Sequence, residues 1–178
     1  MDLQKLREAI FDFPKQDYRA TLSHILQIAI GITGADKGNI QILDPFSHTL
    51  SIVVHDGFEE PFLRFFKDVN GREAAACRTE LKQLARVIIP DVRESRICAG
   101  TESLDVLLGA GVQAVQSTPL VANGSIVGMI STHYRVPTYP TGERLHFLNE
   151  LAQIAADYIL EIRTTSDSPC DNLVPKTH

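Results

Sequence analysis

The stretch GVQAVQSTPLVANGSIVGMISTHY, residues 111–134, decides how the rest of the chain is interpreted. Two runs of strand-forming residues flank Asn123-Gly124, the dipeptide that most strongly favours a two-residue type I′ hairpin turn. The stretch therefore predicts a β-hairpin near the centre of the fold. Its strands nevertheless carry several Gln, Ser, Thr and His side chains, which are unusual in a buried sheet.

A regular two-residue turn fixes the expected pairing, with Ala122 opposite Ser125 and Thr118 opposite Met129. Because cross-strand partners share a face of the sheet, one face is predicted to have a polar centre. Its residues are Ala114, Gln116, Thr118, Met129, Ser131 and His133. The opposite face is predicted to be largely apolar, and its residues are Val115, Ser117, Pro119, Val121, Ile126, Gly128, Ile130 and Thr132.

The residues around the hairpin predict an α+β domain with a mostly antiparallel sheet, since hairpins and helices are present without strict βαβ alternation. Helical periodicity predicts long helices over 3–11, 18–33 and 143–163, with Gly34 as a C-terminal cap. Alternating residues predict a second hairpin over 38–57 and a short strand over 86–92. Short helices are expected over 59–69, from about Ala74, and over 103–109.

The two sets of helices suggest different roles for the two sheet faces. We expect the long helices to cover the apolar face and the short, glycine-interrupted helices to cover the polar face. The polar face then becomes the wall of a small-molecule pocket, which is typically apolar with a few placed polar groups. The predicted ligand-binding residues are Gln41, Gln116, Thr118, Met129, Ser131 and His133. The alternative is a solvated or internally hydrogen-bonded face.

Composition indicates an ordinary globular protein of 178 residues, with one domain over 1–163 and a polar, disordered tail over 164–178. The net charge is −5 and no Lys/Arg cluster occurs, so neither nucleic acid nor a membrane is an expected partner. The sequence has no signal-peptide pattern and no membrane-spanning run, which predicts a cytoplasmic location. The three cysteines, Cys77, Cys98 and Cys170, lack metal-ligand spacing, and no metal site is predicted.

The hairpin stretch, together with LNELAQIAADYIL (148–160) and NGREAAACRTELKQLARVIIPDV (70–92), resembles GAF domains, especially those beside bacterial sensor kinases. The resemblance covers about residues 15–163. It implies a central antiparallel sheet with long helices on one face and a pocket under short helices on the other. It also implies a sensory, signalling role in which an unidentified small molecule binds the pocket.

The sequence markers of known GAF subfamilies reduce the range of expected cofactors but do not identify one. The Asn-Lys-Phe-Asp-Glu signature of cyclic-nucleotide-binding GAF domains is absent. Bilin-binding domains commonly carry histidine after the chromophore cysteine, whereas here Arg78 follows Cys77 and Ala99 follows Cys98. Haem is not excluded as a cofactor by the sequence, but no axial ligand stands out among His24, His48, His55, His133 and His146.

An enzyme on this fold is the alternative reading. The order of Cys77, Asp91-Val92 and Cys98 resembles the free methionine sulfoxide reductase, whose chemistry needs an accessible thiolate and a resolving thiol. That reductase has Asp after its catalytic cysteine, where this chain has Ala99. We therefore favour a non-catalytic sensor, and a dimerisation scaffold that binds no ligand is the third possibility.

The apolar stripe over residues 145–162 predicts a homodimer, because it is broader than packing on the sheet requires. The stripe, with Leu3, Leu6 and Ile10 of the first helix, is expected to meet its copy across a two-fold axis. Signalling would then pass through the dimer or a partner protein. In the alternative, the first helix covers the C-terminal helix of its own chain and leaves a monomer.

Overall fold

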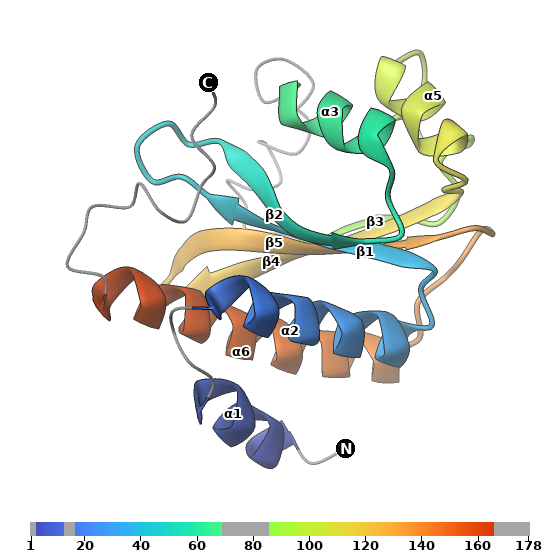
Figure 1. The fold of residues 1–178 in the computed structure, drawn as a ribbon. Coiled ribbons are helices and arrows are strands. Elements are labelled where there is room, and N and C mark those ends of the chain that lie inside the picture. The colour runs from blue at the N-terminus through green and yellow to red at the C-terminus, as the bar shows by residue number, and fades with distance from the viewer. Residues whose placement is uncertain (1–2, 13–16, 69–85, 166–178) are drawn as a thin grey trace.

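The computed structural model describes residues 3–12, 17–68 and 86–165, which form a sheet between two layers of helices (Figure 1). Every neighbouring strand pair is antiparallel, in the order β2-β1-β5-β4-β3. The strands are β1 (Lys37–Leu43), β2 (Leu50–Asp56), β3 (Val87–Ile89), β4 (Ala114–Ala122) and β5 (Ser125–Tyr134). The helices are α1 (Leu3–Asp12), α2 (Tyr18–Thr33), α3 (Glu60–Asp68), α5 (Glu102–Gly109) and α6 (Gly142–Thr165). The predicted α+β class and the division of long and short helices between the faces are confirmed.

The central hairpin has the predicted turn but a different register. Asn123 and Gly124 have φ values of 51° and 74°, as a type I′ turn requires. Ala122 pairs with Ser125 as expected, but Leu120 pairs with Gly128, because a β-bulge leaves Val127 without an opposite residue. One extra residue shifts all the later pairs by one.

The bulge makes the predicted facing of β4 wrong. Gln116 lies opposite Thr132 and Thr118 opposite Ile130, whose side chain is in the core under α2 and α6. Gln116 and Thr118 therefore face the long helices, while Val115 and Ser117 face α3 and α5. The predicted grouping of Met129, Ser131 and His133 on the α3/α5 face is retained, because the bulge precedes all three in β5.

The face under α2 and α6 carries the larger hydrophobic core. Gly34 ends α2 in the left-handed conformation (φ 69°), and its N–H donates to the Ile30 carbonyl oxygen at 2.9 Å. The predicted α6 stripe is buried except at Leu145, which is partly exposed, and Leu148 and Leu151 are inaccessible to solvent. The core side chains that α2 and α6 contribute are Leu22, Ile25, Leu26, Ala29, Leu148, Leu151, Ala152, Ile154, Ala155, Ala156, Tyr158, Ile159 and Ile162.

The first helix packs on the C-terminal helix of its own chain (Figure 1). Ile10 is fully buried in the core with α6, and the Arg7 guanidinium forms an ion pair with Asp157 at 2.7 Å. This contact within one chain is the one expected in the monomer alternative, and the homodimer stays a prediction. The side chains of Leu3 and Leu6 and the predicted tail over 166–178 lie outside the described residues, as does the helix expected from Ala74.

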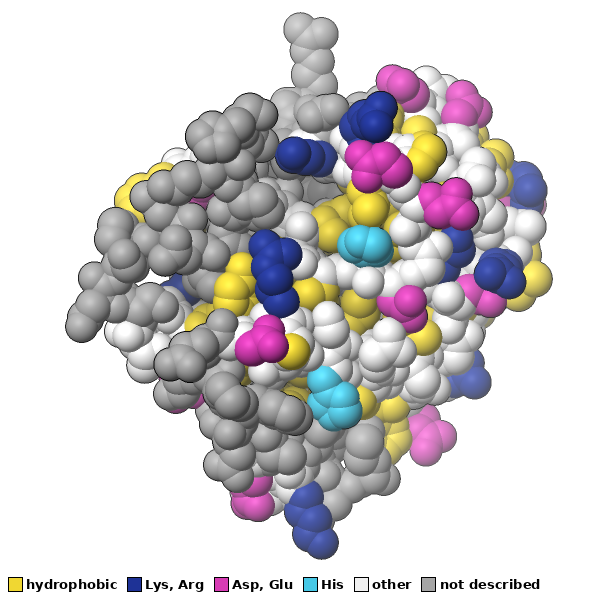
Figure 2. Space-filling view, viewed as in Figure 1, with side chains coloured by type: hydrophobic (Ala, Val, Ile, Leu, Met, Phe, Trp, Pro, Cys, Tyr) yellow, Lys and Arg dark blue, Asp and Glu magenta, His cyan; other side chains and the backbone are white. Residues whose placement is uncertain are grey.

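The described surface shows no large field of one charge on the face drawn in Figure 2, where acidic and basic side chains are interspersed.

Among the described helices, none combines the length and the apolar character needed to cross a membrane.

Candidate functional site

A row of polar side chains crosses the sheet beneath α3 and α5. Asn39 of β1 pairs with Ser131 of β5, which pairs in turn with Ser117 of β4. The Ser117 and Ser131 hydroxyl oxygens are 2.8 Å apart and share a hydrogen bond. His133 lies two residues beyond Ser131 on the same face, because strand side chains alternate. The sheet register therefore brings three strands together to build one polar site.

His133 is held as a neutral imidazole under an aromatic cover. Its ring meets Phe58 edge-on at 4.9 Å and Phe62 at 5.9 Å between centroids, and the two phenyl rings stack at 3.7 Å. Burial, reinforced by the positive charge of Lys37, lowers the pKa of His133 to about 3. The side chain is thus uncharged at neutral pH and presents a donor and an acceptor rather than a cation.

Two atoms of this site lack the hydrogen bonds that buried polar groups normally make. Asn39 and His133 are only 3% and 4% exposed, yet Asn39 Oδ1 and His133 Nδ1 have no hydrogen-bond partner among the described residues. Leaving such a group unsatisfied costs about 1–3 kcal/mol. Buried polar atoms in natural proteins are nearly always hydrogen-bonded. Asn39 Oδ1 and His133 Nδ1 are therefore positions where a ligand or an ordered water can bind.

The surroundings of these polar atoms are apolar. α3 and α5 pack on this face through a second core cluster, whose buried members are Phe58, Phe62, Val87, Ile89, Val92, Cys98, Leu107 and Val112. A few placed hydrogen-bonding groups within an apolar lining are the usual composition of a small-molecule site.

The predicted binding residues are divided by the sheet. Met129, Ser131 and His133 lie on the α3/α5 face with Gln41, which pairs with Met129. Gln116 and Thr118 lie on the α6 side, where Gln116 is buried and Thr118 accepts a hydrogen bond from Arg86. Whether any of these residues binds a ligand stays a prediction.

Sequence reasoning did not select Asn39 and Ser117 as site residues. The alternation of NIQIL already placed Asn39 on the same face as Gln41, so that residue could have been found. Ser117 was assigned to the apolar face, and only the bulge brings its hydroxyl to Ser131.

The cysteine chemistry of the reductase alternative gains no support from Cys98. Its side chain is 4% exposed, and burial raises the pKa of the thiol despite a hydrogen bond with Ser95 that acts in the opposite direction. A catalytic cysteine needs the reverse, an accessible thiolate. Cys77 lies outside the described residues, so the spacing between the two thiols is not described.

The histidines considered for haem are scattered. His24, His48, His55 and His146 are exposed on different elements, and only His133 is buried. Within the described parts of the chain, no group of three or more potential ligands gathers around a possible metal position.

Comparison with known proteins agrees with this architecture. The GAF domain family model matches residues 15–159. The chain belongs to the GAF domain family. A search of curated proteins finds no match.

Solved structures share the GAF fold at low sequence identity. The domain of a putative two-component sensor histidine kinase from Sinorhizobium meliloti 1021 is 20% identical, with a TM-score of 0.64, over 79% of this chain and 89% of that one. The GAF domain of the cyanobacteriochrome TePixJ is 15% identical, with a TM-score of 0.67, over 83% and 92%. The GAF domain of a phosphoenolpyruvate-protein phosphotransferase from Coxiella burnetii is 12% identical, with a TM-score of 0.73, over 93% and 95%.

Proposed function

We propose that this GAF domain is a sensory module that binds an uncharged small molecule on the sheet face under α3 and α5. The observation that carries the proposal is the pair of buried, unpartnered atoms, Asn39 Oδ1 and His133 Nδ1. Membership of the family and its occurrence in a sensor histidine kinase and a cyanobacteriochrome support the sensory role.

The chemistry of the site favours a particular kind of ligand. Asn39 Oδ1 can only accept, so the ligand is expected to offer an N–H or O–H donor. A charged ligand is disfavoured, because the apolar environment that keeps His133 neutral would penalise any unpaired charge. The stacked rings of Phe58 and Phe62 favour a flat or aromatic body, since aromatic groups pack well against such faces.

Strand geometry offers a route from this site to the long helices. Ser131 faces the site, while its neighbour Ile130 is fully buried in the core formed with α2 and α6. A ligand that shifts β5 would therefore change the packing of the short helices and of the long helices together. This requires that the ligand bind one conformation of β5 more tightly than the other. The output through a second copy or a partner protein, and the cytoplasmic location, remain predictions.

Native mass spectrometry of the purified chain tests the ligand directly. We expect a stoichiometric small molecule that is released on denaturation and lacks a permanent charge. A chain that carries no small molecule, and whose thermal midpoint is unmoved by a library of uncharged aromatic compounds, would contradict binding and favour the scaffold alternative. Loss of methionine sulfoxide with a thiol reductant would instead favour the reductase.

A further inference from the structure

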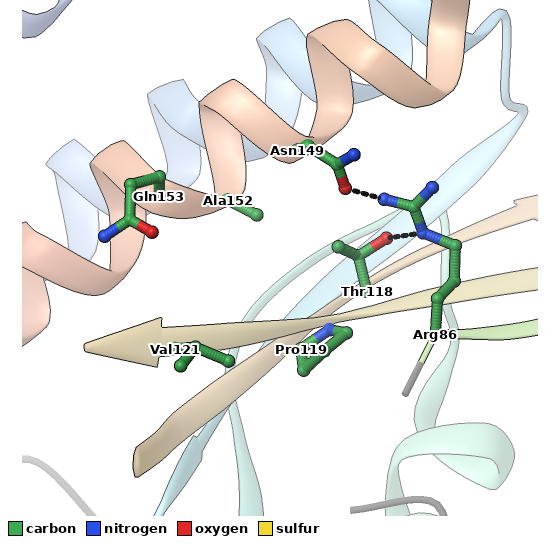
Figure 3. A pocket seen from close by; sticks show the side chains of 7 residues that line it. All are labelled: Arg86, Thr118, Pro119, Val121, Asn149, Ala152 and Gln153. Atoms are coloured by element: carbon green, nitrogen blue, oxygen red, sulfur yellow. Dashed lines mark hydrogen bonds between the residues drawn. The ribbon is translucent and has the colours of Figure 1, made fainter. Parts of the chain in front are cut away.

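A hollow lies on the α6 side of the sheet, between β4 and α6, as Figure 3 shows. Its volume is about 430 Å³. The described residues that line it are Arg86, Thr118, Pro119, Val121, Asn149, Ala152 and Gln153. It shares no lining residue with the site under α3 and α5, so it requires a separate explanation.

The hollow lies beyond the described pairing of β3 with β4. β3 has three residues, and its pairing with β4 reaches no further along β4 than Ser117. Within the described residues, the outer edge of β4 from Thr118 onward has no partner strand. Pro119 suits this position, because it lacks the N–H that a neighbouring strand would need. The edge of β4 therefore forms one wall of an open groove, and α6 forms the other.

Arg86 spans one end of this groove (Figure 3). Its Nε donates to Thr118 Oγ1 at 3.0 Å, and a terminal nitrogen donates to Asn149 Oδ1. Both acceptors are neutral, and the guanidinium group has five N–H donors, of which these bonds use two. Arg86 is half-buried, and this partial withdrawal of its charge from water lowers the pKa of the guanidinium.

Among the described residues, none that lines the groove supplies a counter-ion for this charge. None of its described lining residues is Asp or Glu. The acidic residues of α6 closest in sequence to the lining residue Gln153 are Glu150 and Asp157. Glu150 is exposed and is not a lining residue, and Asp157 is paired with Arg7 at 2.7 Å. A half-buried arginine held by two neutral partners is a preformed receptor for an anion, because a guanidinium binds planar oxyanions in a bidentate manner.

We propose that this groove binds a small molecule through a carboxylate or phosphate group seated on Arg86. The Asn149 amide nitrogen is available as a further donor, since the oxygen of that amide accepts from Arg86. Such a ligand would join the start of β3 to the middle of α6. It would therefore influence the C-terminal helix independently of the site on the opposite sheet face.

Titration with sodium phosphate and with sodium succinate tests the proposal, with sodium chloride at matched ionic strength as the reference. The side-chain amide NMR signals of Asn149 and Gln153 should shift saturably with at least one of the two anions. Arg86→Gln should weaken this binding at least tenfold, whereas Arg93→Gln, at an exposed arginine outside the groove, should leave it unchanged. A response to phosphate alone would assign a phosphate ligand, and a response to succinate alone a carboxylate.

A second variant protects the test against misfolding of Arg86→Gln. Asn149→Asp places a carboxylate beside Arg86 within the chain, so it should raise the thermal midpoint and abolish the response to added anion. Ser23→Asp, on the exposed side of α2, is the matched control and should do neither. Absence of any saturable shift in the wild-type chain overturns the proposal, as does an undiminished response in Asn149→Asp.

Discussion

The two faces of the sheet use the same strands for different purposes. Toward α2 and α6, the strands contribute Ile40, Ile42, Leu120 and Ile130, all fully buried among apolar side chains. Toward α3 and α5, β1 and β5 contribute a row of buried polar groups, of which Asn39 and His133 each have an atom without a described partner, as Gln116 has on the first face. Stability is thus expected to reside mainly on the first face and binding on the second.

The largest expected difference between the faces concerns truncation of the core. Leu148→Ala on α6 removes a fully buried side chain and should lower the free energy of unfolding by about 3–4 kcal/mol, through lost burial and a cavity. Asn39→Leu, on the other face, should change it by less than about 1 kcal/mol, because an unsatisfied amide gives way to an apolar group of similar size. Urea denaturation measures the free energy of unfolding of both variants. Equal losses of stability would contradict the expectation that stability resides mainly on the α2/α6 face.

The backbone that both faces share should tolerate little change at Gly128. A Cβ atom there would lie 2.3 Å from the Gln41 carbonyl oxygen, so β1 and β5 would have to separate. We expect Gly128→Ala to cost about 3 kcal/mol, the upper end for overpacked sites. Thermal or urea unfolding gives the value.

Gly31→Ala is the control for that substitution. Gly31 lies in α2 with open space around its Cβ position, so alanine should raise stability by about 0.5–1 kcal/mol through helix propensity. A Gly128→Ala chain as stable as the wild type would show that the two strands are less closely packed than described.

The polar face should also make folding sensitive to acid. The pKa of His133 is lowered to about 3 in the folded chain, whereas an unfolded histidine titrates near 6.5. The unfolded state therefore binds the proton first, and the stabilisation present above pH 6.5 is lost as the pH falls toward 3. Between pH 6.5 and 5 the loss should be about 2 kcal/mol.

Urea unfolding at several pH values isolates this contribution. His133→Phe should flatten the dependence between pH 6.5 and 5, while His146→Gln, at an exposed position of α6, should retain it. If His133→Phe has the same pH dependence as the wild type, His133 does not stay neutral in the folded chain.

The sequence predicted most of this fold because its strongest signals are local. Asn123-Gly124 specifies the turn, Gly34 specifies the end of α2, and the stripe of α6 marks its buried face. The bulge at Val127 has no such local signal. Because it shifts the pairing by one residue, every side chain of β4 from Leu120 back to Ala114 faces the opposite way from the prediction. The facing predicted for Met129, Ser131 and His133 of β5 is therefore confirmed, whereas the facing predicted for Gln116 and Thr118 of β4 is wrong.

The groove at Arg86 could not be predicted from local patterns either. It depends on where β3 stops along β4 and on the approach of Asn149 from a helix more than sixty residues away in the sequence. Contacts between distant segments are set by tertiary packing, which periodicity does not encode.

The central claim is that the small molecule binds on the α3/α5 face of the sheet. Substitution of one buried amide on each face tests this claim most directly. Asn39 and Gln116 are 3% and 2% exposed, each has an atom without a described partner, and they lie on opposite faces of the sheet. Native mass spectrometry of Asn39→Leu and Gln116→Leu, purified in parallel with the wild type, compares their bound small molecule. The account predicts that Asn39→Leu loses the ligand while Gln116→Leu keeps it, with both chains folded. Retention by Asn39→Leu and loss by Gln116→Leu would contradict the assignment of binding to the α3/α5 face.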